Sequence, residues 1–117
     1  LSLGVLTSAY LRSANLSGAT LIRANLRRAN LSRTNLSHTN FIGSNLVNAD
    51  LRHVDLTGAN LTSVNLSSAN LTGANLSEAN LEHILFDEST NWHDIRGLET
   101  AKKLPTTIKK KLNLSRI

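Results

Sequence analysis

The sequence predicts an all-β solenoid, a chain wound into stacked coils, and two observations support this prediction. First, a large apolar residue returns at every fifth position from Leu6 to Phe86 without interruption. Second, a small or β-branched residue stands two positions before each of them, and asparagine most often stands between the two. A chain that keeps the same two side chains inward through every repeat must bend once per repeat, so it closes into coils.

The five-residue period excludes the regular helix and the flat strand. In an α-helix each residue turns about 100°, so leucines five positions apart would cover every face of the helix. In a flat strand side chains alternate, so each leucine would point away from the previous one. The remaining solution is a short extended segment followed by a polar two-residue corner, as at Ser17 and Gly18. Stacked coils would pair their backbones about 4.8 Å apart.

The repeat unit also resembles a known family. The units Ala-Asn-Leu-Ser-Gly, Ala-Asn-Leu-Arg-Arg and Ala-Asp-Leu-Arg-His look like members of the pentapeptide-repeat family, over about three quarters of the chain. The resemblance implies a right-handed quadrilateral β-helix with four repeats per coil, hence just over four coils, and a bacterial source. Four sides also suit a leucine core, because such a wall would be on the order of 10 Å long, the spacing of packed sheets.

Two parts are expected along the chain. Residues 1–88 form the predicted β-helix, and residues 89–117 form a C-terminal loop and a short α-helical cap. We expect Trp92 to cover the leucines of the last coil while its indole N–H stays in water. Such a cap would protect the apolar end of the stack from solvent.

The cap is predicted to contain two short helices. The first, near residues 97–104, would place three apolar residues on one face: Leu98, Ala101 and Leu104. The second would begin at Pro105, a favoured first helical residue, and would place Ile108 and Leu112 four positions apart.

The N-terminal rim carries two apolar residues, Val5 and Tyr10, where later repeats have asparagine. An open first coil exposes unpaired backbone groups, so we expect either an absent N-terminal cap or an oligomer contact at this rim. The candidate oligomer or cap contacts are Val5, Tyr10, Trp92, Ile108, Leu112 and Leu114. Because the sequence opens at Leu1 without methionine, we expect a processed chain or a fragment, and a cytoplasmic location unless a targeting segment has been lost.

Charge is segregated along the chain, whose formal net charge is +5. Residues 1–49 carry arginine and no acid, residues 50–88 carry most of the acids, and residues 89–117 are basic again. The candidate partner-binding residues are basic side chains at the predicted corners and in the cap: Arg12, Arg23, Arg27, Arg28, Arg33, Arg52, Lys109, Lys110 and Lys111. They predict a surface for an acidic partner, and the alternative is that they only keep the protein soluble.

The predicted register distributes the arginines over the coils. Arg23, Arg28 and Arg33 occupy equivalent corners of successive sides and therefore surround the second coil, whereas Arg12 and Arg52 lie on one side, two coils apart.

Several function classes are disfavoured by the residues. The chain has no cysteine, its histidines (His38, His53, His83 and His93) lack the spacing of a metal site, and it has neither a nucleophile elbow nor a phosphate-binding glycine loop. We therefore expect neither an enzyme nor a bound cofactor. No segment approaches the 18 apolar residues of a membrane span.

The asparagine before each leucine bears on one implied function. Relatives that mimic DNA and inhibit gyrase use aspartate at this position, which makes a continuous acidic wall. Here asparagine predominates, with aspartate only at Asp50 and Asp55, and predicts neutral amide ladders along the stack. Interaction with gyrase as a DNA mimic is thus the weaker expectation.

We expect a noncatalytic protein–protein interaction or structural scaffold module that presents rigid solenoid faces to an unidentified protein partner, with homodimerisation through a helix end as a further expectation. The alternative is binding of nucleic acid or an anionic membrane surface through the lysines of the basic C-terminal cap.

Overall fold

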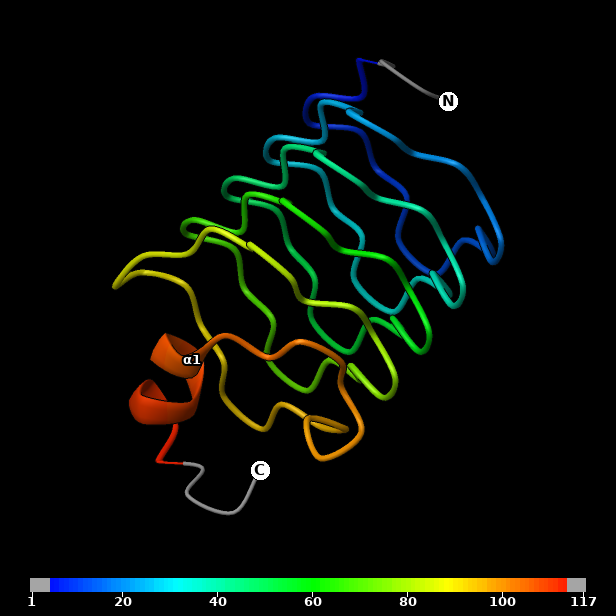
Figure 1. Cartoon of the computed structure of the whole chain (residues 1–117). Helices are drawn as coiled ribbons and strands as arrows, with labels where there is room; N and C mark the ends of the chain where they lie inside the picture. Colours follow the sequence, from blue (N-terminus) through cyan, green and yellow to red (C-terminus); the bar gives the residue numbers. More distant parts are fainter. Residues whose placement is uncertain (1–4, 114–117) are drawn as a thin grey trace.

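The computed structural model describes residues 5–113, and most of them wind into a stack of four-sided coils (Figure 1). Parallel bridges join residues about 20 positions apart, as from Val5 to Asn25 and from Asn25 to Asn45. Bridged residues follow one another at five-residue intervals, so four of them occupy one coil. The predicted solenoid is therefore the architecture that the structure shows.

Each repeat contains a tight turn and one paired side. The carbonyl of Leu6 accepts a hydrogen bond from the N–H of Ala9 (2.9 Å), and the same bond recurs in the following repeats. In the regular repeats the third residue of each turn has a positive φ, as in a type II turn; Ser8 has a φ of 61°. Between the turns the backbone bonds to the next coil, as from the N–H of Leu6 to the carbonyl of Asn25 (2.7 Å). Each side is too short for more than an isolated bridge.

The core is a column of leucines with small residues packed between them. From Leu21 to Leu81 the leucine position of every repeat is at most 1% exposed, including Phe41. Where threonine takes the small position, its hydroxyl is bonded: Thr39 donates to the carbonyl of Leu36 (2.7 Å). These buried polar groups are therefore compatible with the apolar column.

The asparagines do not act as predicted. Their side-chain oxygens accept hydrogen bonds from the backbone N–H two residues later, as from Ser17 to Asn15 (3.1 Å) and from Thr72 to Asn70 (3.1 Å). Asp55 does the same for Thr57 (3.0 Å). The expected bonding along the stack is thus replaced by a local Asx turn, because the corner presents a free N–H within reach of each side-chain oxygen.

The bridge ladder continues beyond the regular repeats. Asn91, Arg96 and Lys102 bridge to the coil before them, although two of the intervals have lengthened to six residues. The predicted helix at residues 97–104 is therefore wrong: this segment is a further turn and bridge of the solenoid. The apolar residues of this segment, Leu98, Ala101 and Leu104, pack against the core. Their three-residue spacing resembles that of a helix because this repeat is one residue longer than the regular ones.

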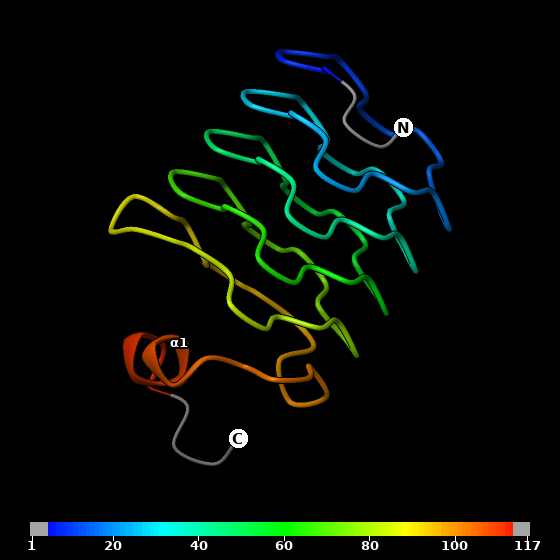
Figure 2. The ribbon, with the colours of Figure 1, turned by 45° about the horizontal axis from the view of Figure 1, so that its top comes forward.

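The helix predicted at Pro105 is present as α1 (Thr106–Lys111). Pro105 precedes it with a φ of −59°, and Ile108 is its buried residue. Figure 2 shows α1 beside the last turns of the solenoid.

Trp92 differs from its prediction. The residue is 5% exposed, and within residues 5–113 its buried indole nitrogen has no hydrogen-bond partner. Trp92 follows the bridged residue Asn91, so it takes the inward position that leucine has in regular repeats. There its ring packs edge to face on Phe86 (centroids 5.8 Å apart, 85° between planes). Its N–H is thus carried into the core and does not stay in water.

Candidate functional site

Because coils stack in register, equivalent corners form four ridges along the molecule. One ridge consists of residues 12–13, 32–33, 52–53 and 72–73, and we call it the arginine ridge. Its backbone is hydrogen-bonded from coil to coil. The Ser13 N–H donates to the Ser32 carbonyl (3.0 Å), and the Arg33 N–H donates to the Arg52 carbonyl (2.9 Å). Side chains on this ridge are therefore held at the spacing of stacked strands.

The arginine ridge carries a small cleft of about 120 Å³. Its lining residues come from three successive coils: Arg12, Ser32, Arg33, Arg52 and His53. The arginines are exposed, whereas Ser32 is 4% exposed and its hydroxyl donates to the Asn30 side-chain oxygen (2.7 Å). The structure thus gathers three cationic side chains around a polar hollow.

Asp50 is the acid of this cluster. Its carboxylate accepts two hydrogen bonds from the Arg52 guanidinium, from Nε (2.8 Å) and from Nη2 (2.7 Å). These bonds, helped by the charge of Arg12, hold the pKa of Asp50 below its usual range, and they raise the pKa of Arg52. One of the three positive charges is therefore offset.

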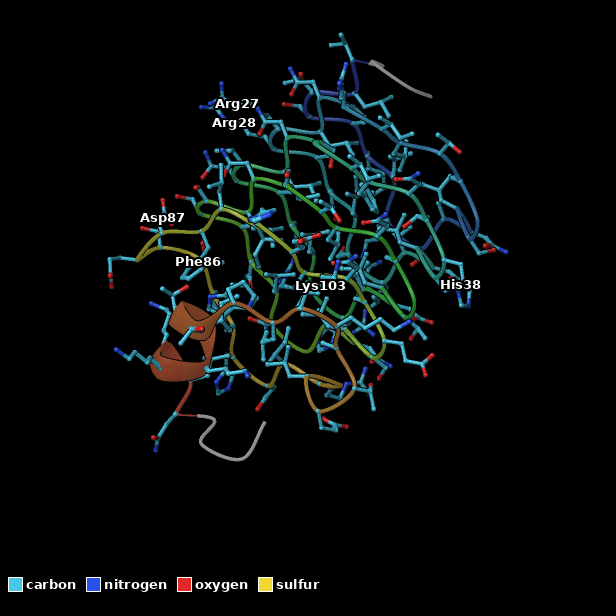
Figure 3. All side chains as sticks on the ribbon, viewed as in Figure 1. Arg27, Arg28, His38, Phe86, Asp87 and Lys103 are labelled. Carbon is cyan, nitrogen blue, oxygen red and sulfur yellow. The ribbon has the colours of Figure 1, made fainter. Side chains whose placement is uncertain are left out.

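The other predicted arginines lie on other ridges. Arg27 and Arg28 lie on one side of the stack and His38 on the opposite side (Figure 3). Arg23 occupies a further corner, where its side chain lies over Gly43. The structure thus brings Arg12, Arg33 and Arg52 together and leaves Arg23, Arg27 and Arg28 apart. Sequence reasoning missed Ser32 and His53 in this cluster, although the 20-residue register places them there.

The C-terminal lysines are partly neutralised by nearby acids. Lys111 forms an ion pair with Glu88 (3.7 Å), and Lys103 pairs with Glu82 (3.3 Å). Lys109 is half-buried and Lys110 is exposed. Part of the positive charge of Lys109, Lys110 and Lys111 is therefore offset by a neighbouring acid.

Beside α1 lies an open depression of about 650 Å³, and its lining mixes both signs of charge, with Glu88, Asp94 and Lys111. Ile108 is fully buried and Leu112 half-buried, so both contact the core, while Leu114 lies outside the described residues.

The exposed apolar residues gather toward the ends of the stack. At the N-terminal rim, Val5 is 78% and Tyr10 73% exposed. Leu85, which sequence reasoning missed, is 57% exposed. Successive bridges connect Val5 to Leu85 along one side of the stack, so they lie at its opposite ends.

Within residues 5–113, no three His, Cys, Asp or Glu side chains gather as a metal site would require. In the same residues, no helix has both the length and the apolar character needed to cross a membrane.

Comparison with known proteins agrees with this geometry. A family model described as pentapeptide repeats, in eight copies, matches residues 5–43 and 44–82. No curated protein matches the chain significantly.

The chain is similar to several solved structures of pentapeptide repeat proteins. One from the cyanobacterium Cyanothece 51142 is 42% identical, with a TM-score of 0.78, over 79% of this chain and 63% of that chain. One from Nostoc Pcc 7120 is 29% identical (TM-score 0.61; 79% of this chain, 83% of that one). One from the Arabidopsis thaliana thylakoid lumen is 27% identical (TM-score 0.57; 87% and 76%). The chain thus spans less than two thirds of the length of the Cyanothece protein.

Proposed function

The chain belongs to the pentapeptide repeat family, and we propose that it is a noncatalytic interaction module that binds an acidic protein segment through the arginine ridge. Similarity to the solved members implies that the four-sided coils form a right-handed quadrilateral β-helix. Members of this family are generally structural or interaction modules, which supports a binding role.

The observation that carries the proposal is the gathering of Arg12, Arg33 and Arg52 on one ridge. The stacked backbone fixes the spacing of these corners, so little backbone entropy of this protein would be lost when a partner binds. The leucine column fills the interior, which leaves the outer ridges as the surfaces where recognition can take place. Opposite charge on the partner would also speed association.

Residues 89–117 are proposed to cap the C-terminal end of the β-helix of residues 1–88, with α1 as the helical part. The burial of Ile108 and the contact of Leu112 with the core support this role. The exposed Val5 and Tyr10 at the N-terminal rim are proposed as an oligomer contact. A cytoplasmic location is proposed as well; the Arabidopsis relative is a thylakoid-lumen protein.

The alternatives have less support. Binding of nucleic acid through α1 is weakened by the pairing of Lys111 with Glu88. A DNA mimic needs a continuous acidic stripe, but Asp50 and Asp55 lie on different sides, and Asp50 is paired with Arg52. These observations favour the arginine ridge.

Affinity capture with two matched triple variants tests the proposal. One variant changes the ridge residues Arg12, Arg33 and Arg52 to glutamine, and the other changes Arg23, Arg27 and Arg28, so both lose three positive charges. We expect the ridge variant to lose a protein that the wild type and the second variant both capture, with or without nuclease, in extract from the source cells.

Equal loss from both variants would show that general charge, and not the ridge, carries binding. Loss of all captured protein after nuclease treatment would instead move the function to nucleic acid, and a Lys109, Lys110 and Lys111 to glutamine variant would then be expected to abolish capture.

A further inference from the structure

We propose that the cleft on the arginine ridge is a binding site for a phosphate monoester dianion. The inference deepens the proposed function and rests on it, because it names the group on the partner that the ridge would recognise. Five residues from three coils build the site: Arg12, Ser32, Arg33, Arg52 and His53.

The cleft is large enough for a small anionic group. A volume of about 120 Å³ is well below the 300–1,000 Å³ typical of pockets for drug-sized molecules. At about 30 Å³ per water in the liquid, it holds roughly four waters. A single tetrahedral oxyanion fits this space.

The charge of the cleft favours a dianion over a carboxylate. Arg12, Arg33 and Arg52 carry three positive charges, and the ionised Asp50 beside Arg52 offsets one. A phosphate monoester carries nearly two negative charges at neutral pH and has three strong acceptor oxygens. A single carboxylate would leave part of the positive charge uncompensated.

Enough hydrogen-bond donors remain for the ligand. Arg52 gives two N–H groups to Asp50, and its guanidinium has five, so three are left. The guanidiniums of Arg12 and Arg33 are exposed and form no ion pair among those found in residues 5–113. Guanidinium groups bind phosphate through paired, charge-assisted hydrogen bonds.

The site is held in place by its surroundings. The Ser32 hydroxyl and N–H both bond to Asn30 (2.7 and 3.0 Å), which fixes the floor of the cleft. His53 is kept at one end, because its ring lies where a side chain on Gly73 would otherwise stand. Binding would thus need little rearrangement beyond the arginine side chains.

Two pairs of variants test the site through gain and loss of affinity. Asp50→Asn keeps the local Asx turn but removes the carboxylate that pairs with Arg52. The control Asp55→Asn makes the same change on the neighbouring side, where no arginine follows. Arg33→Asn and Arg28→Asn each remove one arginine at a corner of positive φ, which asparagine tolerates.

The measurement is an NMR titration of ¹⁵N-labelled protein with inorganic phosphate and, separately, with O-phosphoserine, at constant ionic strength set by chloride. We expect amide shifts centred on Ser13, Arg33 and His53. Asp50→Asn should tighten binding about threefold to tenfold, and Arg33→Asn should weaken it about tenfold, as for one charge-assisted contact. Asp55→Asn should match the wild type, and Arg28→Asn should change affinity less than twofold.

Shifts spread evenly over all arginine corners, or equal effects of Arg33→Asn and Arg28→Asn, would overturn the proposal. Saturation by inorganic phosphate but not by O-phosphoserine would overturn the monoester assignment in favour of the free anion. If phosphate does not bind while the ridge variant still loses its captured protein, this inference fails and the interaction module stands. If phosphate binds while capture is unaffected by the ridge variant, the proposed function fails instead.

Discussion

In the regular repeats the third residue of each corner adopts a left-handed backbone, and most of the side chains found there are not glycine. Serine, arginine, histidine and glutamate all occupy this position, with φ between 56° and 62° in the regular repeats. Such a conformation costs an ordinary residue on the order of 1 kcal/mol. The solenoid therefore tolerates a repeated local strain, because each corner is fixed by bonds to the neighbouring coils.

Gly97 directly follows the bridged residue Arg96, and there both the backbone conformation and the neighbouring backbone favour glycine. Its φ is 83°, and a Cβ there would collide with the backbone of Ser77, 2.7 Å from Cα. Gly18 has a φ of 72°, but a Cβ there would meet nothing within 4 Å.

We expect Gly18→Ala to cost about 1 kcal/mol of unfolding free energy, from the backbone conformation alone. Gly97→Ala should cost about 1–3 kcal/mol more, because the backbone of the preceding coil must shift. Denaturant unfolding of the two variants measures both values. Equal losses would mean that the contact with Ser77 relaxes freely.

Asparagine before leucine serves the corner that follows it. The Asn60 oxygen accepts from the backbone N–H (3.1 Å) and the hydroxyl (2.6 Å) of Thr62. Aspartate offers the same acceptor, which explains why Asp50 and Asp55 fit into the repeat.

Asn60→Ala should therefore destabilise the protein by about 1–2 kcal/mol, because both hydrogen bonds to the Asn60 oxygen are lost, and Asn60→Asp should be nearly neutral. Thermal unfolding of the two variants at neutral pH compares them directly. A larger loss in Asn60→Asp than in Asn60→Ala would show that the amide group, and not the acceptor oxygen, is what the repeat needs.

At the scale of elements, α1 depends on its packing. A helix of six residues is too short to be stable alone, and Pro105 provides no side-chain cap. Ile108 is fully buried against the end of the solenoid, whereas Lys110 on the same helix is exposed. The position of α1 thus rests mainly on Ile108, and Leu112 at its end adds a partly buried contact.

Ile108→Ala is expected to release α1 while the coils stay folded, and Lys110→Ala should leave it in place. Hydrogen exchange at the Leu112 amide, which bonds to the Ile108 carbonyl (3.0 Å), reports the release. We expect protection at that amide to fall about tenfold or more in Ile108→Ala, since removing a buried isoleucine side chain typically costs 2–5 kcal/mol. Unchanged protection would show that other contacts hold the helix.

At the scale of the whole molecule, burial increases from the first coil inward. Leu11 in the first coil is only half-buried, because just one neighbouring coil covers it, whereas Leu61 is fully buried between two coils. Each coil of a solenoid is stabilised by contacts with its neighbours, so a side chain in an end coil contributes less to the free energy of unfolding than one in a central coil.

Leu61→Ala should cost about 2–5 kcal/mol, as for a buried leucine, and Leu11→Ala about 1 kcal/mol. Denaturant unfolding followed by circular dichroism measures both losses. Similar values for the two variants would mean that the first coil is covered in solution, as an oligomer contact through Val5 and Tyr10 would require.

The sequence by itself determined the winding of this protein. Each five-residue unit contains its own inward pair, its Asx turn and its corner, so the period alone identifies which residues are buried from Leu21 to Leu81. The turn and the Asx turn of each repeat are local, and the stacking repeats at a fixed interval, so both can be read from the spacing.

Only the tertiary structure decided how far the coils continue beyond the regular repeat and which side chains meet. Insertions after Leu85 break the period, and bridges at Asn91, Arg96 and Lys102 form because pairing with the coil before them overrides the local pattern. Likewise, the register placed Arg12 and Arg52 on one side, but the cleft they share with Arg33 depends on where long side chains settle across coils. Contacts between residues about 20 positions apart create both features, and no local spacing contains them.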